Sequence, residues 1–356
     1  MLVKQCPRYL RGEEMIIDLE NHFVTDAWVS ILSENQGFPR VETDRATGLL
    51  NLHYHPDTSM PLGLIGKLLD LGAGRIAALD AAGIDVAVLS QATPGVESLD
   101  PSIGTRLARA TNDALAEAIA VHPNRFQGFA ALAPNDVDSA VRELERAVLD
   151  LGLKGWHTLS NFGDTFLDDK RYWPILAKVE ELNVPIYIHP TIPTIPQLRT
   201  YGWGLAGAAF GFGVDTSLVM MRLLLSGAFD AFPRLKIILG HYGEGFPFMM
   251  DRVNRPFLQG HVRTDPRIAP KLKLMPADYL KNNMVVSTSG NYLPEAFTCT
   301  KDTLGTERMV VGTDYPFEDM NACMDFLAER PLSVKERDQL YHGTAQALGM
   351  GPARRS

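Results

Sequence analysis

The sequence predicts an α/β protein with one domain, a (β/α)8 TIM barrel with long loops over the carboxyl ends of its strands. The 356-residue chain is 46% hydrophobic and 21% charged, which is typical of a globular protein with a full core. Short apolar runs alternate with helix-like stretches along the chain. No long linker or low-complexity segment divides it. Repeated strand–helix units therefore favour one barrel over two domains.

Eight runs have the length and β-branched content of buried parallel strands. They cover residues 16–20, 85–90, 126–132, 154–159, 185–189, 236–240, 284–288 and 309–313, of which 154–159 is the least strand-like. Helical patterns separate many of them, at residues 103–122, 136–151, 169–182, 216–229 and 333–348. We expect the barrel to span residues 15–350, with an N-terminal extension at 1–14 and a C-terminal tail at 351–356.

Two connections are longer than a barrel needs, residues 24–62 and 190–215. The first contains a short helical piece followed by His53 and His55. Loops after barrel strands lie over the active site, so the length of these two indicates function. We expect both histidines to be solvated loop residues, with substrate contact as the alternative.

Composition excludes several classes of protein. Lys and Arg number 34 against 42 Asp and Glu, for a net charge of −8, so no nucleic-acid partner is expected. No apolar stretch approaches the length of a membrane span, so no membrane partner is expected either. The three cysteines, Cys6, Cys299 and Cys323, are far apart, which argues against a disulfide framework and favours a cytoplasmic location. GxSxG, Walker and strand-linked GxGxxG motifs are absent, so no organic cofactor is expected.

Metal-ligand side chains follow the predicted strands. The first strand ends in Glu20-Asn21-His22, the fifth in His189, and Asp314 follows the eighth. Glu20 and His22 are two residues apart, so they point the same way from a strand. The carboxyl ends of parallel strands meet at one mouth. We therefore expect two imidazoles and two carboxylates to hold one divalent ion, Zn²⁺ or Mn²⁺, with an open position for water or substrate.

Two further polar residues follow the sixth strand. His241 is expected beside the metal as a catalytic proton donor, acceptor or anchor, with a fifth metal ligand as the alternative. Glu244, three residues on, can hold a ring nitrogen of His241, or can instead cap the helix that begins near Gly245. His157, on the fourth strand, can line the mouth, although no partner for it is evident.

Four segments carry a resemblance to a known family. They are Glu20-Asn21-His22-Phe23, Tyr187-Ile188-His189-Pro190, the run 240–245 (GHYGEG) and the run 312–318 (GTDYPFE). From about residue 16 to residue 348 the chain resembles the decarboxylase branch of the amidohydrolase superfamily. This branch includes γ-resorcylate, 2,3-dihydroxybenzoate and 5-carboxyvanillate decarboxylases and, more distantly, aminocarboxymuconate semialdehyde decarboxylase.

The resemblance implies metal ligation by the four residues named above, and a catalytic His241 that Glu244 supports. It implies that Phe23 and Tyr315, within the same motifs, contact the substrate. Arg252 matches an arginine that relatives insert into a neighbouring subunit's active site, which implies a homodimer or homotetramer. The alternative for Arg252 is a solvated helix residue.

Two departures from the family pattern bear on the substrate. Glu20 stands where amidohydrolases that hydrolyse carry a histidine, which favours the resorcylate-like branch. The arginine that binds the substrate carboxylate in carboxyvanillate decarboxylase has no clear equivalent, because Arg40 and Arg45 do not align with it.

The resemblance therefore implies a carboxy-lyase that removes CO2 from a small hydroxylated aromatic acid without oxidation. Asp314 would protonate the ring carbon before the C–C bond breaks. The alternative keeps the metal but activates water, giving a hydrolase or hydratase that acts on an ester, lactone, amide or unsaturated acid. A third interpretation is a non-catalytic barrel with a structural metal.

Overall fold

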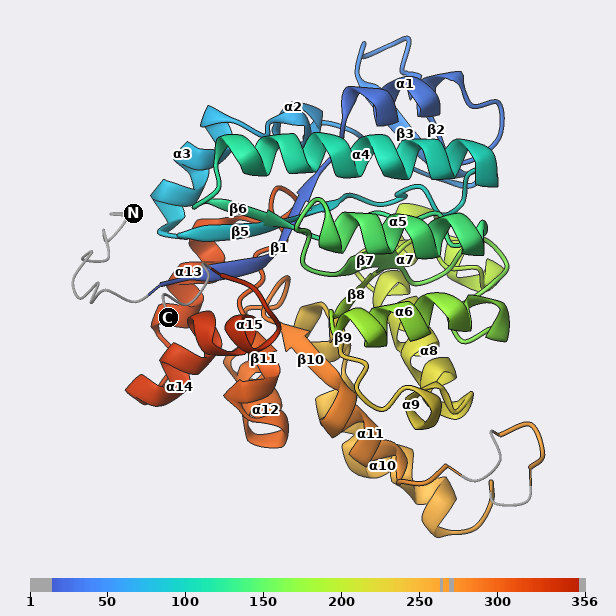
Figure 1. Cartoon of the computed structure of the whole chain (residues 1–356), viewed down its shortest axis with the longest axis vertical. Coiled ribbons are helices and arrows are strands. Elements are labelled where there is room, and N and C mark those ends of the chain that lie inside the picture. The colour runs from blue at the N-terminus through green and yellow to red at the C-terminus, as the bar shows by residue number, and fades with distance from the viewer. Residues whose placement is uncertain (1–14, 263–264, 269–271, 352–356) are drawn as a thin grey trace.

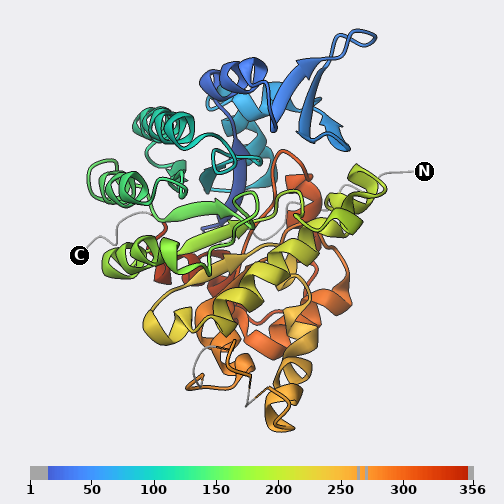
Figure 2. The same ribbon diagram turned by 90° about the vertical axis from the view of Figure 1, so that its right-hand side faces the viewer.

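A computed structural model describes residues 15–262, 265–268 and 272–351 of the chain (Figures 1 and 2). The predicted extension at 1–14 lies outside these residues, as does the predicted tail from residue 352 onward. A strand lies within or across each of the eight predicted runs: β1 (Ile17–Phe23), β5 (Val86–Gln91), β6 (Phe126–Gly128), β7 (Trp156–Leu159), β8 (Ile186–His189), β9 (Ile237–Leu239), β10 (Met284–Ser287) and β11 (Met309–Val310). The predicted strand–helix alternation is therefore present.

The strands form two parallel sheets, with orders β1-β5-β6 and β11-β10-β9-β8-β7. Isolated parallel bridges join the sheets at both edges. Asp18 pairs with Val311 between β1 and β11, and Ala130 pairs with Trp156 between β6 and β7. This is the strand order of a barrel, but the hydrogen bonding gives two bridged sheets and not one continuous closed sheet.

Helices cover the outside of the strands (Figure 1). The main ones are α3 (Ala73–Ala82), α4 (Pro101–Val121), α5 (Val137–Leu149), α6 (Trp173–Leu182), α8 (Gly211–Leu225), α10 (Phe246–Leu258), α12 (Pro294–Leu304) and α13 (Met320–Ala328). The start of α5 follows from its sequence, because the Asp136 side chain accepts a hydrogen bond from Ser139 N. The helix predicted at 216–229 begins earlier, and left-handed Gly227 separates α8 from the short α9 (Ala228–Ala231). The predicted helix 333–348 is α14 (Val334–Asp338), a π turn and α15 (Thr344–Ala347).

The segment 24–62 is more ordered than the predicted loop. The expected helical piece is α1 (Asp26–Glu34), but β2 (Arg40–Thr43), β3 (Leu50–His55) and β4 (Thr58–Pro61) follow as an antiparallel sheet. Figures 1 and 2 show this sheet and α1 at one end of the molecule. In β3, Leu52 and Tyr54 are buried while His53 and His55 are only partly covered, a period-two pattern that predicts a strand. His53 and His55 therefore belong to β3 and not to a loop.

Among the described residues, no helix is both long enough and apolar enough to cross a membrane.

Candidate metal centre

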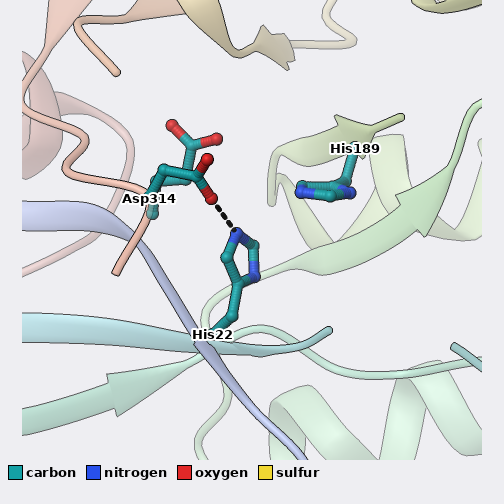
Figure 3. A group of neighbouring side chains, drawn as sticks. His22, His189 and Asp314 are labelled. Carbon is teal, nitrogen blue, oxygen red and sulfur yellow. Dashed lines mark ion pairs between the residues drawn. The ribbon is translucent and has the colours of Figure 1, made fainter. Parts of the chain in front are cut away.

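The four predicted ligands lie together at the carboxyl ends of their strands. β1 supplies Glu20 and His22, β8 ends at His189, and Asp314 follows β11. One ligand atom from each side chain lies within 4.8 Å of the others. Figure 3 shows His22, His189 and Asp314 pointing toward a common point. Glu20, His22 and His189 are buried and Asp314 is half-buried, so the group is largely shielded from water.

A β-bulge in β1 sets the direction of two of these side chains. The register with β5 shifts between Asp18 and Asn21. Leu19, within this shift, packs in the cluster that fills the space between the strands. A bulge inserts one extra residue and displaces the alternation of side chains. Glu20 and His22 therefore point inward, and Asn21 turns toward the helices.

The hydrogen bonds around the four residues leave ligand atoms free. Ser90 Oγ lies 3.1 Å from Nδ1 of His22, and the carbonyl oxygen of Pro190 lies 2.7 Å from Nδ1 of His189. Ser287 Oγ donates to Glu20 Oε2 at 2.6 Å. Glu20 Oε1 has no hydrogen-bond partner in the described structure, and His22 Nε2 and Asp314 Oδ1 have only their ion-pair contact with each other. Buried polar atoms rarely lack partners, so this donor set fits a divalent cation that accepts nitrogen and oxygen ligands.

The electrostatics suit metal ligation. Burial, and then the neighbouring His22, lower the pKa of His189 to about 3, so the ring is neutral, as a ligand must be. Burial favours the protonated form of Asp314, but its contacts with His22 and His241 outweigh burial and lower its pKa. Asp314 Oδ1 lies 3.1 Å from His22 Nε2, and Oδ2 lies 3.9 Å from His241 Nε2.

His241 and Glu244 lie on a left-handed turn directly after β9. His241, Tyr242 and Glu244 have φ angles of 50°, 59° and 52°, which cost energy for residues with a Cβ atom. The turn brings Nδ1 of His241 to 2.8 Å from Oε1 of Glu244. Helix α10 has Gly245 at its N-cap and no side-chain cap, so the helix-capping alternative for Glu244 is wrong.

The charge of the pair follows from this contact. Burial lowers the pKa of His241, but the Glu244 carboxylate, with Asp314 and Glu20, outweighs burial and raises it well above its usual value. These carboxylates, with Glu244 the largest contributor, therefore favour the protonated form of His241 at the edge of the site. A cation there can bind an anionic substrate oxygen.

The structure separates two predicted substrate contacts from the metal ligands. Phe23 is fully buried in the outer core cluster, because the bulge turns it to the same side of β1 as Asn21. Tyr315 belongs to the same cluster, and the Arg75 guanidinium lies 5.2 Å from its ring centroid. Both side chains pack among core residues, and their contact with the substrate stays a prediction. Arg252 lies exposed on α10, and its insertion into a neighbouring subunit stays a prediction.

Other residues lie beside the ligands, and of these the sequence indicated only His157. The Phe317 ring centroid lies 5.8 Å from that of His22, and Phe317 is part of the run that contains Asp314. His157 is buried, with ring centroids 5.4 Å from His189 and 5.8 Å from His22, and its Nε2 has no hydrogen-bond partner in the described structure. The serines at positions 90 and 287 face the ligands from neighbouring strands. Each stands at or next to the end of a predicted strand, and this position in the sequence could have identified them.

Parallel strands whose carboxyl ends carry imidazoles and carboxylates are typical of metal-dependent barrel enzymes. The sequence model of the amidohydrolase family matches residues 19–348. The protein therefore belongs to the amidohydrolase family.

Several members of this family that are similar to the chain are named decarboxylases. A γ-resorcylate decarboxylase of Polaromonas sp. (strain JS666) is 34% identical over 343 residues, covering 93% of this chain and 97% of the relative. Crystal structures of two decarboxylases are also similar. That of 5-carboxyvanillate decarboxylase from Sphingomonas paucimobilis has a TM-score of 0.84 at 32% identity and covers 94% of this chain and 98% of the other. That of a dihydroxybenzoic acid decarboxylase from Polaromonas sp. JS666, with manganese and the inhibitor 2-nitroresorcinol, has a TM-score of 0.78 at 34% identity and covers 94% and 96%.

Proposed function

We propose that this protein is a metal-dependent, non-oxidative decarboxylase of a hydroxylated aromatic carboxylic acid. The observation that carries the proposal is the buried cluster of two imidazoles and two carboxylates, next to His241, whose Nδ1 lies 2.8 Å from the Glu244 carboxylate. The relatives named decarboxylases support the same reaction class. We further propose that the two bridged sheets form one (β/α)8 barrel over residues 15–350, as the family implies.

Glu20, His22, His189 and Asp314 would hold one divalent ion, for which manganese is the first choice because a similar structure contains it. When bound, the ion supplies a positive charge that stabilises the carboxylate and phenolate oxygens of the substrate. Zn²⁺ is the competing choice, since it accepts the same donors.

Asp314 is proposed to move the proton. Direct loss of CO2 from a benzoate would leave an aryl carbanion, which is very basic. The ionised Asp314 instead takes the proton of the ortho hydroxyl and delivers it to the ring carbon that bears the carboxylate. The C–C bond then breaks, its electron pair restores the aromatic ring, and CO2 leaves. The phenolate finally takes a proton from solvent, so atoms and charge balance.

His241 and Glu244 are proposed to bind the substrate. The Glu244 carboxylate fixes the His241 ring through Nδ1, which leaves Nε2 available to a substrate oxygen. A positioned donor of this kind stabilises negative charge that develops during the reaction. A homodimer or homotetramer, with Arg252 of one copy at the neighbouring site, and a cytoplasmic location remain predictions from the sequence.

The test uses metal-loaded protein with a panel of ortho-hydroxybenzoates, including resorcylates, dihydroxybenzoates and carboxyvanillate, while CO2 release is followed. We expect metal-dependent CO2 release that Asp314→Asn abolishes and that Asp325→Asn, on the exposed face of α13, leaves intact. Metal-loaded protein that releases no CO2 but cleaves esters or lactones would instead establish the hydrolase alternative.

A further inference from the structure

A second polar cluster, outside the ligand set, holds the bulge of β1. Asp18 is fully buried. Its Oδ1 accepts hydrogen bonds from Glu20 N at 3.1 Å and from Thr313 N at 3.0 Å. Its Oδ2 accepts from Thr313 Oγ1 at 2.6 Å and from Asn21 Nδ2 at 2.9 Å. The Asp18 carboxylate therefore contacts the ligand Glu20 directly. It also contacts Asn21 and Thr313, which are the neighbours in sequence of His22 and Asp314.

This carboxylate replaces part of the backbone ladder between β1 and β11. Leu19 N donates to Val311 O at 2.9 Å, and His22 N donates to Tyr315 O at 2.7 Å. Between these two bonds the described structure has isolated bridges and no regular pairing of the two strands. The backbone donors of Glu20 and Thr313 lie at this gap and bond to Asp18, so they are not left buried and unpaired.

Arg75 of α3 supports the cluster from the helix side. Its side chain is fully buried, and Nη1 donates to Asn21 Oδ1 at 2.5 Å. Nε and Nη2 donate to the carbonyl oxygens of Asp70 and Lys67 at 2.7 and 2.8 Å, which fixes the plane of the guanidinium. Its contact with the ring of Tyr315 reaches the residue next to Asp314. Arg75 thus touches both ligand-bearing segments.

We propose that Asp18, Asn21 and Arg75 form a positioning brace that sets the spacing of Glu20, His22 and Asp314, and through it the metal affinity. The proposal rests on the proposed metal site. A slip of β1 by one residue would exchange the inward and outward side chains, placing Asn21 where a ligand belongs. The brace opposes this slip because Asn21 Nδ2 and Oδ1 are held by Asp18 and Arg75 on the helix side.

The first variant is Asp18→Asn, measured by titration of full-length, metal-free protein with Mn²⁺ while free Mn²⁺ is followed by electron paramagnetic resonance. Asn at this position keeps an oxygen for the two backbone donors. Its amide group, however, faces the amide donor of Asn21, so that hydrogen bond is lost. Loss of a residue that orients ligands typically weakens metal binding by about 10- to 100-fold, and we expect a weakening in this range. Arg75→Lys keeps the positive charge but loses the several fixed N–H donors of the guanidinium. We expect it to weaken Mn²⁺ binding as well.

The matched control is Glu143→Gln. Glu143 is also a buried carboxylate that accepts from an asparagine, Asn112 Nδ2 at 2.8 Å, and from an arginine, Arg146 Nη2 at 2.7 Å, but it joins α4 to α5. We expect this variant to unfold at lower urea concentration and to bind Mn²⁺ like wild type. Equal Mn²⁺ affinity in wild type, Asp18→Asn and Arg75→Lys would overturn the brace, as would an equal loss in the control.

A second readout separates the brace from the proposed function. Amide hydrogen exchange in metal-free protein should become faster within residues 18–22 and 311–315 in Asp18→Asn but not in Glu143→Gln. If wild type binds no Mn²⁺ and no Zn²⁺, the proposed function and the effect of the brace on metal affinity both fail, and the exchange data then test only whether the brace holds the two segments in place. Unchanged exchange in both segments would refute it.

Discussion

Glu97 offers a quantitative test of the electrostatics at the mouth of the strands. It lies in the connection between β5 and α4 and is 3% exposed. Val96 N donates to its Oε2 at 2.7 Å, and the described residues provide no cation to pair with it. Burial outweighs its backbone hydrogen bonds and raises the pKa of Glu97 from 4.5 to about 7. The substitution to test is Glu97→Gln, which keeps the shape and removes the titration.

The sign and size follow from linkage. Below pH 4.5 the carboxyl is neutral in both states and contributes no pH dependence. Between pH 4.5 and 7 the unfolded chain ionises while the folded protein stays protonated, so stability falls as pH rises. A rise from 4.5 to about 7, at about 1.36 kcal/mol per pKa unit, corresponds to about 3 kcal/mol of lost stability above pH 7. Between pH 5 and pH 8 about 2.5 kcal/mol of this is expected to appear.

The assay is urea unfolding followed by tryptophan fluorescence at pH 5 and pH 8. The stability of Glu97→Gln relative to wild type should rise by about 2.5 kcal/mol from pH 5 to pH 8. Comparing the two pH values removes any pH-independent effect of the substitution on packing. Glu117→Gln, at an exposed position of α4, is the control and should show no such rise. A difference that is constant or falls with pH would refute the assigned environment of Glu97.

Two further predictions concern the metal centre. Ser287→Ala removes the 2.6 Å hydrogen bond to Glu20 Oε2, and a bond to a charged group is worth about 1.5–3 kcal/mol. We expect this variant to bind Mn²⁺ at least tenfold more weakly in the Mn²⁺ titration described above. The control is Ser226→Ala, which removes a hydroxyl that donates to Leu223 O in α8 and should leave Mn²⁺ binding unchanged. Treatment with a chelator should lower the unfolding midpoint, because an ion at about 100 times its Kd stabilises the folded state by about 2.7 kcal/mol. An unfolding curve that chelator and added Mn²⁺ leave unchanged would contradict the proposed site.

The strand order and the ligand cluster follow from the sequence for one physical reason. Buried parallel strands are short apolar runs, and the residues that follow them must meet at one edge. Glu20, His189 and Asp314 are therefore identified as neighbours although up to 294 positions separate them. The hydrogen bond between His241 and Glu244 likewise follows from their spacing and common location after β9.

The directions in which individual side chains point are harder to predict from the sequence. Alternation along a regular strand would keep Leu19 on one side and Glu20 on the other, and the bulge that puts both inside has no composition signal in the run IDLENHF. The same bulge explains why Phe23 packs in the outer core. The small sheet β2–β4 was missed because its strands are short and lie within a segment rich in polar residues. Only the alternation in β3 indicates it.

The seam between β1 and β11 connects the fold to the chemistry. The first and last parallel strands meet there through isolated bridges, and the backbone donors in the gap bond to Asp18. Glu20 and His22 lie on one side of the seam and Asp314 on the other. A cation shared by these residues would therefore join the two edges at the point where the backbone pairing is weakest. We expect metal binding to slow amide exchange along this seam more than elsewhere in the protein.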